Sequence, residues 1–328
     1  MQEYAVARSS STCRVARRPS RNAWNTSCRC YPTSVYSGHK DNVFAVAWSP
    51  AGHVIASAGR DRTVQLWDPD SGLSLLTYTQ HQQCVLSLAW SPDGCYLASG
   101  DTAGVIHVWR ATDGECVSIY RGHARFVRSI AWSYDGQTIV SGGDYGDSTV
   151  QVWHAFSAQR RAIYVSPYRL FATCWSPGDT RIGAASFDGV VRLWDTAESN
   201  DEPLITYRGH TGPVYALSWS PDGHYLASAG QDVTVQFWLA NTGKAIYTYR
   251  SHTRPVKALA CSASSNLLAS GGDDTSVQVW SALQEDRRAV FTDHRSWIRS
   301  LAWSPDSTRV VSCSQDIVRI WQPAFTIS

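Results

Sequence analysis

Three residue types that could perform acyl transfer lie close together in the stretch from His210 to Trp238. His210 could act as a general base, Ser228 as the nucleophile and Asp232 as the group that orients the base. Those residue types divide the work in this way in hydrolase triads. Whether the stretch is catalytic depends on how often the same combination recurs along the chain.

The combination recurs five times, each time followed by a tryptophan. The complete sets are His39, Ser57, Asp61 and Trp67; His123, Ser141, Asp147 and Trp153; His210, Ser228, Asp232 and Trp238; His252, Ser270, Asp274 and Trp280; and His294, Ser312, Asp316 and Trp321. The second unit has Ala103 at the aspartate position, and the fourth has Ser166 and Ala184 at the histidine and serine positions. An enzyme needs one preorganised site, so five copies predict a repeated structural role and no catalytic residues.

The cysteines and the other histidines show no pattern typical of a metal or cofactor site. The chain has nine cysteines, and Cys28 and Cys30 lie close together without a second pair at metal-ligand spacing. Glycine pairs such as Gly271-Gly272 lack the strand–loop–helix context of a phosphate-binding loop. We therefore expect no metal and no cofactor. Free thiols are typical of a reducing compartment, which predicts a cytoplasmic protein.

Tryptophan reveals an internal repeat, because thirteen of the fifteen tryptophans fall at two recurring positions. The first series is Trp67, Trp109, Trp153, Trp194, Trp238, Trp280 and Trp321. The second is Trp48, Trp90, Trp132, Trp175, Trp219 and Trp303, with Cys261 in the remaining place. A period of about 42 residues, repeated seven times, is typical of a solenoid or a propeller.

Each unit contains four short segments with strand character. In the fifth unit they are ALSWS, YLASAG, TVQFW and AIYTYR. The turn Pro221-Asp222-Gly223 separates the first two, since proline presets φ and glycine accepts positive φ. In the third segment we expect Val and Trp to face inward, with Thr and Gln facing outward. Four short strands in about 42 residues predict one propeller blade.

The units resemble WD40 repeats. The pairs that carry the resemblance are Gly38-His39, Gly122-His123, Gly209-His210, Trp67-Asp68 and Trp194-Asp195. The near-identical segments of the repeats, such as AWSPDG and LASGG, resemble those of the highly regular WD40 arrays common in bacteria. The resemblance covers roughly residues 31–325 and implies an all-β fold, a seven-bladed propeller of four-stranded antiparallel blades. It also implies that an N-terminal strand, residues 30–36, completes the last blade beside the strand ending at Trp321, which removes open sheet edges.

The chain divides into a leader and a propeller. Residues 1–29 are a basic, Ser- and Arg-rich segment that we expect to be a disordered tail, with an organelle transit peptide as the alternative. The expected propeller covers 30–328, with repeats near 36–77, 78–119, 120–162, 163–206, 207–248, 249–290 and 291–328. Outside residues 1–35 the chain holds 23 basic and 26 acidic residues, so the body is mildly acidic. No apolar run is long enough to span a membrane.

The resemblance assigns a structural role to the recurrent sets. It implies a buried hydrogen-bond network in each blade, running from Trp through Ser and His to Asp. Indole N–H, hydroxyl, imidazole and carboxylate groups can satisfy one another in such a chain. Each link contributes about 1 kcal/mol net to stability, and an unpaired buried member costs about 1–3 kcal/mol.

The resemblance also implies that the first strand of each blade lines the central channel and begins on the face that carries the His and Asp loops. The residues at the start of that strand are Phe44, Leu86, Arg128, Phe171, Tyr215, Lys257 and Arg299. Neighbouring positions on the same face add Arg60, Phe126, Arg169, Phe187 and Trp297, together with polar residues such as Asn42, Gln231 and Asp273. Aromatic and arginine side chains dominate these positions and are enriched in binding hot spots.

These residues predict a non-enzymatic scaffold that docks a protein or peptide partner on the ring face. We expect the partner segment to be acidic, because Arg128, Arg169 and Lys257 would pair with its carboxylates, as would Arg299. We expect no small-molecule substrate and no membrane, and a monomeric propeller working within a complex. Two alternatives stay open: a nucleic-acid-associated propeller that uses the basic leader and the rim, and the propeller part of a larger signalling regulator.

Overall fold

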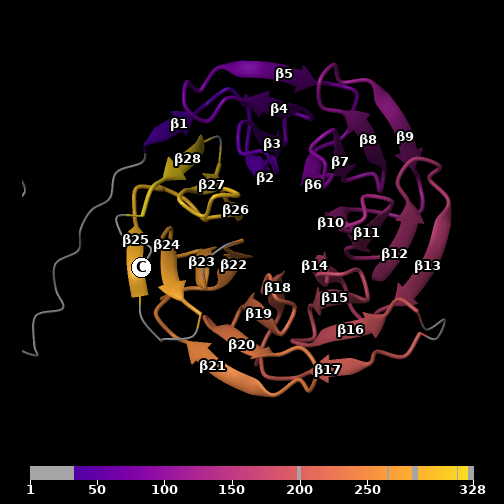
Figure 1. The fold of residues 1–328 in the computed structure, drawn as a ribbon, viewed down its shortest axis with the longest axis vertical. Coiled ribbons are helices and arrows are strands. Elements are labelled where there is room, and N and C mark those ends of the chain that lie inside the picture. Colours follow the sequence, from indigo (N-terminus) through magenta and orange to yellow (C-terminus); the bar gives the residue numbers. More distant parts are fainter. Residues whose placement is uncertain (1–32, 198–200, 264–265, 283–286, 316, 324–328) are drawn as a thin grey trace, which may run out of the picture.

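Seven four-stranded antiparallel sheets are arranged around one axis, as the repeat predicts (Figure 1). The computed structural model describes residues 33–197, 201–263, 266–282, 287–315 and 317–323. The predicted fold, an all-β seven-bladed propeller with four-stranded blades, is confirmed. Within these residues there is no helix that is long and apolar enough to cross a membrane. The expected leader, residues 1–29, lies outside the described residues, and the repeat boundaries stay a prediction.

The strands occupy the same four places in every blade. The innermost strands are β2 (Val43–Trp48), β6 (Val85–Trp90), β10 (Val127–Trp132), β14 (Leu170–Trp175), β18 (Val214–Trp219), β22 (Val256–Cys261) and β26 (Ser300–Trp303). The second are β3 (Ile55–Gly59), β7 (Tyr96–Asp101), β11 (Thr138–Gly143), β15 (Arg181–Ser186), β19 (Tyr225–Gly230), β23 (Leu267–Gly272) and β27 (Val310–Ser314). The third are β4 (Val64–Trp67), β8 (Ile106–Arg110), β12 (Thr149–His154), β16 (Val191–Asp195), β20 (Val235–Leu239), β24 (Val277–Ser281) and β28 (Ile317–Trp321). The outermost are β5 (Ser74–Tyr78), β9 (Cys116–Tyr120), β13 (Arg160–Val165), β17 (Ile205–Tyr207), β21 (Ala245–Tyr249), β25 (Arg287–Phe291) and β1 (Ser34–Tyr36).

The Ser-Pro-Asp-Gly turns hold the first two strands of a blade in register. In the fifth blade the Ser220 hydroxyl accepts a hydrogen bond from Tyr225 N–H at 2.9 Å, and Asp222 accepts one from His224 N–H at 3.0 Å. Gly223 adopts a φ of 71°, a conformation that a residue with a Cβ rarely adopts. The turn thereby sets the pairing of Trp219 with Leu226.

The N-terminal strand closes the ring (Figure 1). β1 pairs antiparallel with β28, placing Ser34 opposite Ile320 and Tyr36 opposite Val318, and Thr33 N–H donates to Ile320 O. Closure by an N-terminal strand is therefore consistent with the expectation from the sequence, although residues 30–32 lie outside the described part. The last blade takes its fourth strand from the opposite end of the chain.

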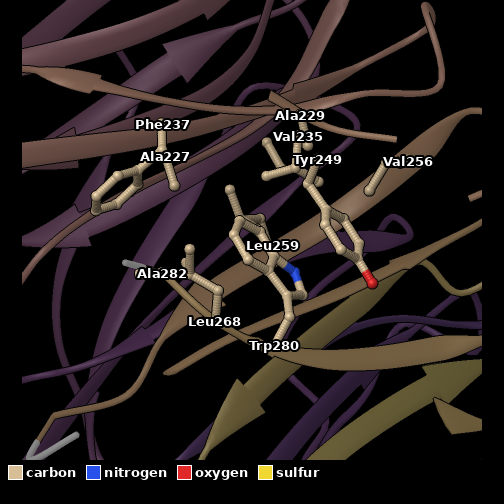
Figure 2. Close-up of a cluster of buried hydrophobic side chains, with 11 residues drawn as sticks. Ala227, Ala229, Val235, Phe237, Tyr249, Val256, Leu259, Leu268, Trp280 and Ala282 are labelled. Atoms are coloured by element: carbon tan, nitrogen blue, oxygen red, sulfur yellow. The ribbon is translucent and has the colours of Figure 1, made fainter. Parts of the chain in front are cut away.

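Consecutive blades are joined by stacked aromatic rings. The aromatic residue near the end of each outermost strand lies flat on the third-strand tryptophan of the next blade. In the pair that Figure 2 shows, the Tyr249 and Trp280 ring centroids are 4.5 Å apart with an interplanar angle of 7°. The seven pairs are Tyr36–Trp67, Tyr78–Trp109, Tyr120–Trp153, Tyr164–Trp194, Tyr207–Trp238, Tyr249–Trp280 and Phe291–Trp321.

The third strands do not expose their glutamines, Thr234 is also buried, and our expectation of outward Thr and Gln in the fifth blade is wrong. Gln65, Gln151, Gln236 and Gln278 are all buried. Each accepts a hydrogen bond from the stacked tyrosine of the preceding blade, for example Tyr36 Oη to Gln65 Oε1 at 2.7 Å. This bond also explains the glycine before the histidine, because a Cβ at Gly38 would lie 2.4 Å from Tyr36 Oη. Strand alternation fails here because each blade is covered on both faces by its neighbours.

The recurrent residues form buried networks. In the fifth blade Trp238 Nε1–H donates to Ser228 Oγ (3.2 Å), the Ser228 hydroxyl donates to His210 Nε2 (2.8 Å), and His210 Nδ1 lies 2.9 Å from Asp232 Oδ2. The carboxylate can only accept, so Nδ1 carries the proton. Although burial alone would raise the pKa of Asp232, hydrogen bonds from His210, Thr234 and the Thr211 amide lower it to about 2.

The first and third blades repeat this network with His39, Ser57, Asp61, Trp67 and with His123, Ser141, Asp147, Trp153. In the sixth blade His252 contacts Ser270 and Asp274, but Trp280 Nε1 has no hydrogen-bond partner among the described residues. In the seventh blade His294 contacts Ser312 and, through Nδ1, Ser314, while Trp321 donates to Ser312. Asp316 lies outside the described residues.

The second blade corrects the alignment that placed Ala103 at its aspartate position. Asp101, two residues earlier, lies 3.1 Å from His81 Nδ1 and accepts the Ala103 and Val105 amides, so the network is complete. The fourth blade replaces the network with an ion pair between Arg192 and Asp188 at 2.6 Å, and Trp194 donates to the Asp201 carbonyl instead of a serine.

One buried histidine is peculiar to the second blade. His107 occupies the place of the glutamine, accepts the Tyr78 hydroxyl at 2.8 Å, and stacks on His81 with centroids 4.2 Å apart. Burial and the neighbouring His81 lower the pKa of His107 to about 4 from its ordinary value of 6.5. Protonation of His107 would remove the acceptor for Tyr78 and place a cationic ring against the stacked His81 ring.

We predict that removing β1 destabilises the ring. A chain lacking residues 1–36 should lose about 3 kcal/mol, since the strand pairing and the burial of Tyr36 are lost together, and melt several degrees lower. The matched control lacks residues 1–32 and keeps Thr33 to Tyr36. Calorimetry of both chains against the full-length protein measures the effect, and equal melting temperatures for the two truncations would contradict closure by β1.

We predict that His107 makes the protein sensitive to mild acid. The unfolded chain binds a proton near pH 6.5 and the folded chain only near pH 4, so the free energy of unfolding falls as the pH drops between these values. His107→Gln restores the residue found in four other blades and should reduce the drop in melting temperature between pH 7.5 and 5.0 by several degrees. A remaining drop is expected from His294, whose pKa burial lowers to about 3. The exposed His224→Gln serves as control, and identical pH profiles for His107→Gln and wild type would refute the assignment.

Candidate functional site

The buried networks are unsuited to catalysis. Ser228 is fully buried, and its hydroxyl is already bonded to His210 and Trp238. A nucleophile must be reachable by substrate and needs an oxyanion site beside it. The described residues also contain no group of three or more His, Cys, Asp or Glu side chains that could hold a metal ion.

The residues at the start of the innermost strands meet at one end of the propeller axis. All seven line a cavity of about 290 Å³, which we call the mouth cavity. Its complete lining is Phe44, Leu86, Arg128, Phe171, Tyr215, Lys257, Asp273, Trp297, Ile298 and Arg299. Figure 1 views the molecule close to this axis, with β2, β6, β10, β14, β18, β22 and β26 innermost.

A β-bulge aims most of these side chains into the cavity. In six blades the strand register shifts around the second residue of the innermost strand, as between Val214 and Ala216 on either side of Tyr215. The bulged residue leaves the ladder and its side chain is redirected. In the seventh blade Arg299 precedes β26, and its amide donates to Cys313 O. The sequence carries no glycine at these positions that would have announced a bulge.

Aromatic and cationic side chains contact one another around the mouth cavity. The Lys257 ammonium lies 3.4 Å from the centroid of Tyr215, and the Arg299 guanidinium lies 5.0 Å from that of Phe44. Phe171 meets Tyr215 edge-on at 4.9 Å. Cation–π contacts of this kind hold long basic side chains in place while leaving part of each charge available to a ligand.

Arg169, Phe126 and Phe187 were predicted as binding residues and lie beside the cavity instead of in its lining. The Arg169 guanidinium lies 4.2 Å from the Phe187 centroid and 5.3 Å from the Phe171 centroid, so it sits between two rings. Phe126 lies beneath Arg128 at 5.8 Å. Phe187 and Trp297 are exposed rings, with 41% and 55% of their surfaces accessible.

Two predicted basic residues are already paired within the chain. Arg128 Nε donates to the buried Asp144 at 2.5 Å, and Arg60 lies 3.7 Å from Asp41 at the exposed rim. Arg128 therefore carries a neutralised charge, and Arg60 takes no part in the cavity. Asp144 lies just before the two extra residues of the third blade, and the spacing of the sequence does not predict its pairing with Arg128.

Asp273 is not among the predicted binding residues, but its side chain lines the cavity. Its Oδ2 lies 3.8 Å from Lys257 Nζ, and its Oδ1 is buried without a hydrogen-bond partner. Burial raises the pKa of Asp273, and burial also lowers the pKa of Lys257. Both shifts have the sign expected for charges removed from water, which strengthens their interactions with an incoming ligand.

Comparisons with known proteins agree with this geometry. The family model described as WD domain, G-beta repeat matches residues 30–68, 72–110, 114–154, 167–195, 201–238, 243–281 and 286–322. Similar proteins include the target of rapamycin complex subunit wat1 of Schizosaccharomyces pombe, 37% identical over 93 residues (28% of this chain and 29% of that protein). Human F-box-like/WD repeat-containing protein TBL1X is 39% identical over 72 residues (22% and 12%), and bovine WD repeat-containing protein 1 is 33% identical over 85 residues (25% and 14%).

The matched stretches span less than a third of these relatives. The family assignment therefore rests on the seven repeat matches, which together cover most of the chain, and on the seven blades that the structure forms from them. With its stacked blades, buried networks and closing strand, the chain belongs to the WD40 repeat family.

Proposed function

We propose that the protein is a non-enzymatic scaffold whose ring face docks an acidic segment of a protein partner. The observation that carries the proposal is the mouth cavity, where Lys257 and Arg299 sit against aromatic rings beside the exposed Trp297. Aromatic anchors with partly desolvated cations are the composition of a protein-binding hot spot. One relative is named as a complex subunit, which supports a role in assemblies.

The charges favour an anionic partner. Lys257 and Arg299 line the cavity and Arg169 lies beside it, whereas Asp273 is the one acidic residue among the lining residues. Arg128 contributes less than predicted, because Asp144 accepts its Nε–H. A carboxylate entering from the partner would restore local neutrality and form charge-assisted hydrogen bonds.

The proposal includes a cytoplasmic location and a monomeric propeller that acts within a complex. The described cysteines Cys84, Cys95, Cys116, Cys174, Cys261 and Cys313 are free thiols, which supports a reducing compartment.

We predict that a peptide library displayed on phage and selected on the protein yields segments rich in Asp and Glu with at least one aromatic residue. The Trp297→Ala/Arg299→Glu variant should bind the selected peptides about 30-fold more weakly, since central hot-spot residues contribute 2 kcal/mol or more. Calorimetric titration of the strongest peptide measures the loss.

The control variant is Leu75→Ala/Arg161→Glu, which changes an exposed apolar residue and an exposed arginine on the outermost strands β5 and β13. It should bind like wild type. Selection of peptides without acidic residues, or equal binding by the ring-face variant with an unchanged melting temperature, would overturn the proposal.

A further inference from the structure

The carboxylate of Asp273 lacks the hydrogen bonds that a partly buried anion requires. Oδ1 is buried without a hydrogen-bond partner in the described part of the chain, and Oδ2 lies 3.8 Å from the Lys257 ammonium. Only 18% of the Asp273 side chain is exposed. A charge in this setting costs free energy unless a donor reaches it. Asp273 lines a cavity large enough for a ligand, so a bound group that carries an N–H could donate to Oδ2 and stabilise the carboxylate.

The same corner of the cavity also calls for an anion. Arg299 is close enough to Lys257 to lower the pKa of its ammonium, and both influence the carboxyl of Asp273. A ligand bound here therefore meets one acceptor and two cations. A cationic ligand would be repelled by Lys257 and Arg299, and a ligand with a carboxylate alone would leave Asp273 unsatisfied and repel it. The matching ligand offers both an N–H and a carboxylate.

The short distance between Asp273 and Lys257 restricts how far apart those two ligand groups can lie. In an α-amido carboxylate the nitrogen and the carboxylate carbon are joined through one Cα and lie about 2.5 Å apart. The ligand N–H can then donate to Asp273 Oδ2 while a carboxylate oxygen of the same ligand pairs with Lys257 Nζ, because these two protein atoms are only 3.8 Å apart. The side-chain carboxylate of an internal Asp or Glu stands one or two carbons further from its backbone N–H. The geometry therefore favours a chain terminus over an internal acidic residue.

We propose that the mouth cavity binds the C-terminal residue of a partner polypeptide. The terminal carboxylate pairs with Arg299 and Lys257, and the backbone N–H of the same residue donates to Asp273. Its side chain packs against Phe171 and Tyr215, whose rings meet edge-on in the cavity lining. A volume of about 290 Å³ suits one residue and not an extended segment. This inference rests on the proposed docking function and names the chemistry of the segment that enters.

Four capped tripeptides test the inference. The probes are acetyl-Gly-Gly-Phe with a free carboxylate, its C-terminal amide, its analogue N-methylated at Phe, and acetyl-Gly-Phe-Asp amide, which has only a side-chain carboxylate. Their dissociation constants are measured by ligand-observed saturation-transfer NMR on the full-length protein. The free-acid peptide should bind at least tenfold more tightly than each of the other three, because a hydrogen bond or ion pair to a charged group is lost in each case.

Variants assign each preference to its residue. Asp273→Ala should abolish the discrimination between the free-acid and N-methylated peptides, and Arg299→Gln should abolish that between acid and amide. Asp41→Ala, an exposed acid at the rim of the same face, is the matched control and should change neither ratio. Asp273→Asn is measured beside Asp273→Ala, and the melting temperature of each variant is compared with wild type.

Equal binding of the free-acid, N-methylated and side-chain-acid peptides overturns the inference. If Arg299→Gln still weakens all three, acidic docking stands and only the terminal-residue chemistry fails. No binding by any carboxylate probe, together with display selections that lack acidic residues, overturns both the inference and the docking function.

Discussion

Every blade of this propeller depends on a ring supplied by the blade before it. The outermost strand of one sheet lays an aromatic side chain on the third-strand tryptophan of the next, at centroid distances of 4.4–5.3 Å. A blade therefore cannot bury its tryptophan alone, and the chain must close to satisfy all seven. β1 matters for that reason, since Tyr36 covers Trp67 and completes the circle.

The tilt of these rings follows from one hydrogen bond. Five stacks whose tyrosine hydroxyl donates to a glutamine or to His107 are nearly parallel, with interplanar angles of 0–7°. The two stacks on Trp194 and Trp321, where the glutamine position holds Arg192 and Arg319, are tilted by 29° and 25°. The hydroxyl therefore fixes the angle of each stack, and aromatic contact alone permits a wider range.

The fold was predictable because its signals repeat, and the site was less so because its features occur once. Seven copies of tryptophan and five of the His–Ser–Asp set identify the blade. A tyrosine three residues before five of the six network histidines repeats almost as clearly, with Phe291 at the sixth place. Asp101 replaces an aspartate from two residues earlier, which a column alignment cannot show. Asp144 neutralises Arg128 from the single loop that carries an insertion. Such partners depend on three-dimensional proximity that spacing does not encode.

The blades and the mouth cavity follow different rules for polar groups. In the blades, hydroxyl, imidazole and carboxylate groups satisfy one another, and hydrogen bonds hold the pKa of Asp61 and Asp274 near 2. In the cavity lining, Asp273 keeps an unpaired oxygen, and burial drives its pKa upward. A neutral residue fits this position of the repeat, because Gln231 occupies the equivalent position in the fifth blade. A costly charge at a position that lines a cavity is consistent with a binding function, because a ligand can supply hydrogen bonds that the chain does not.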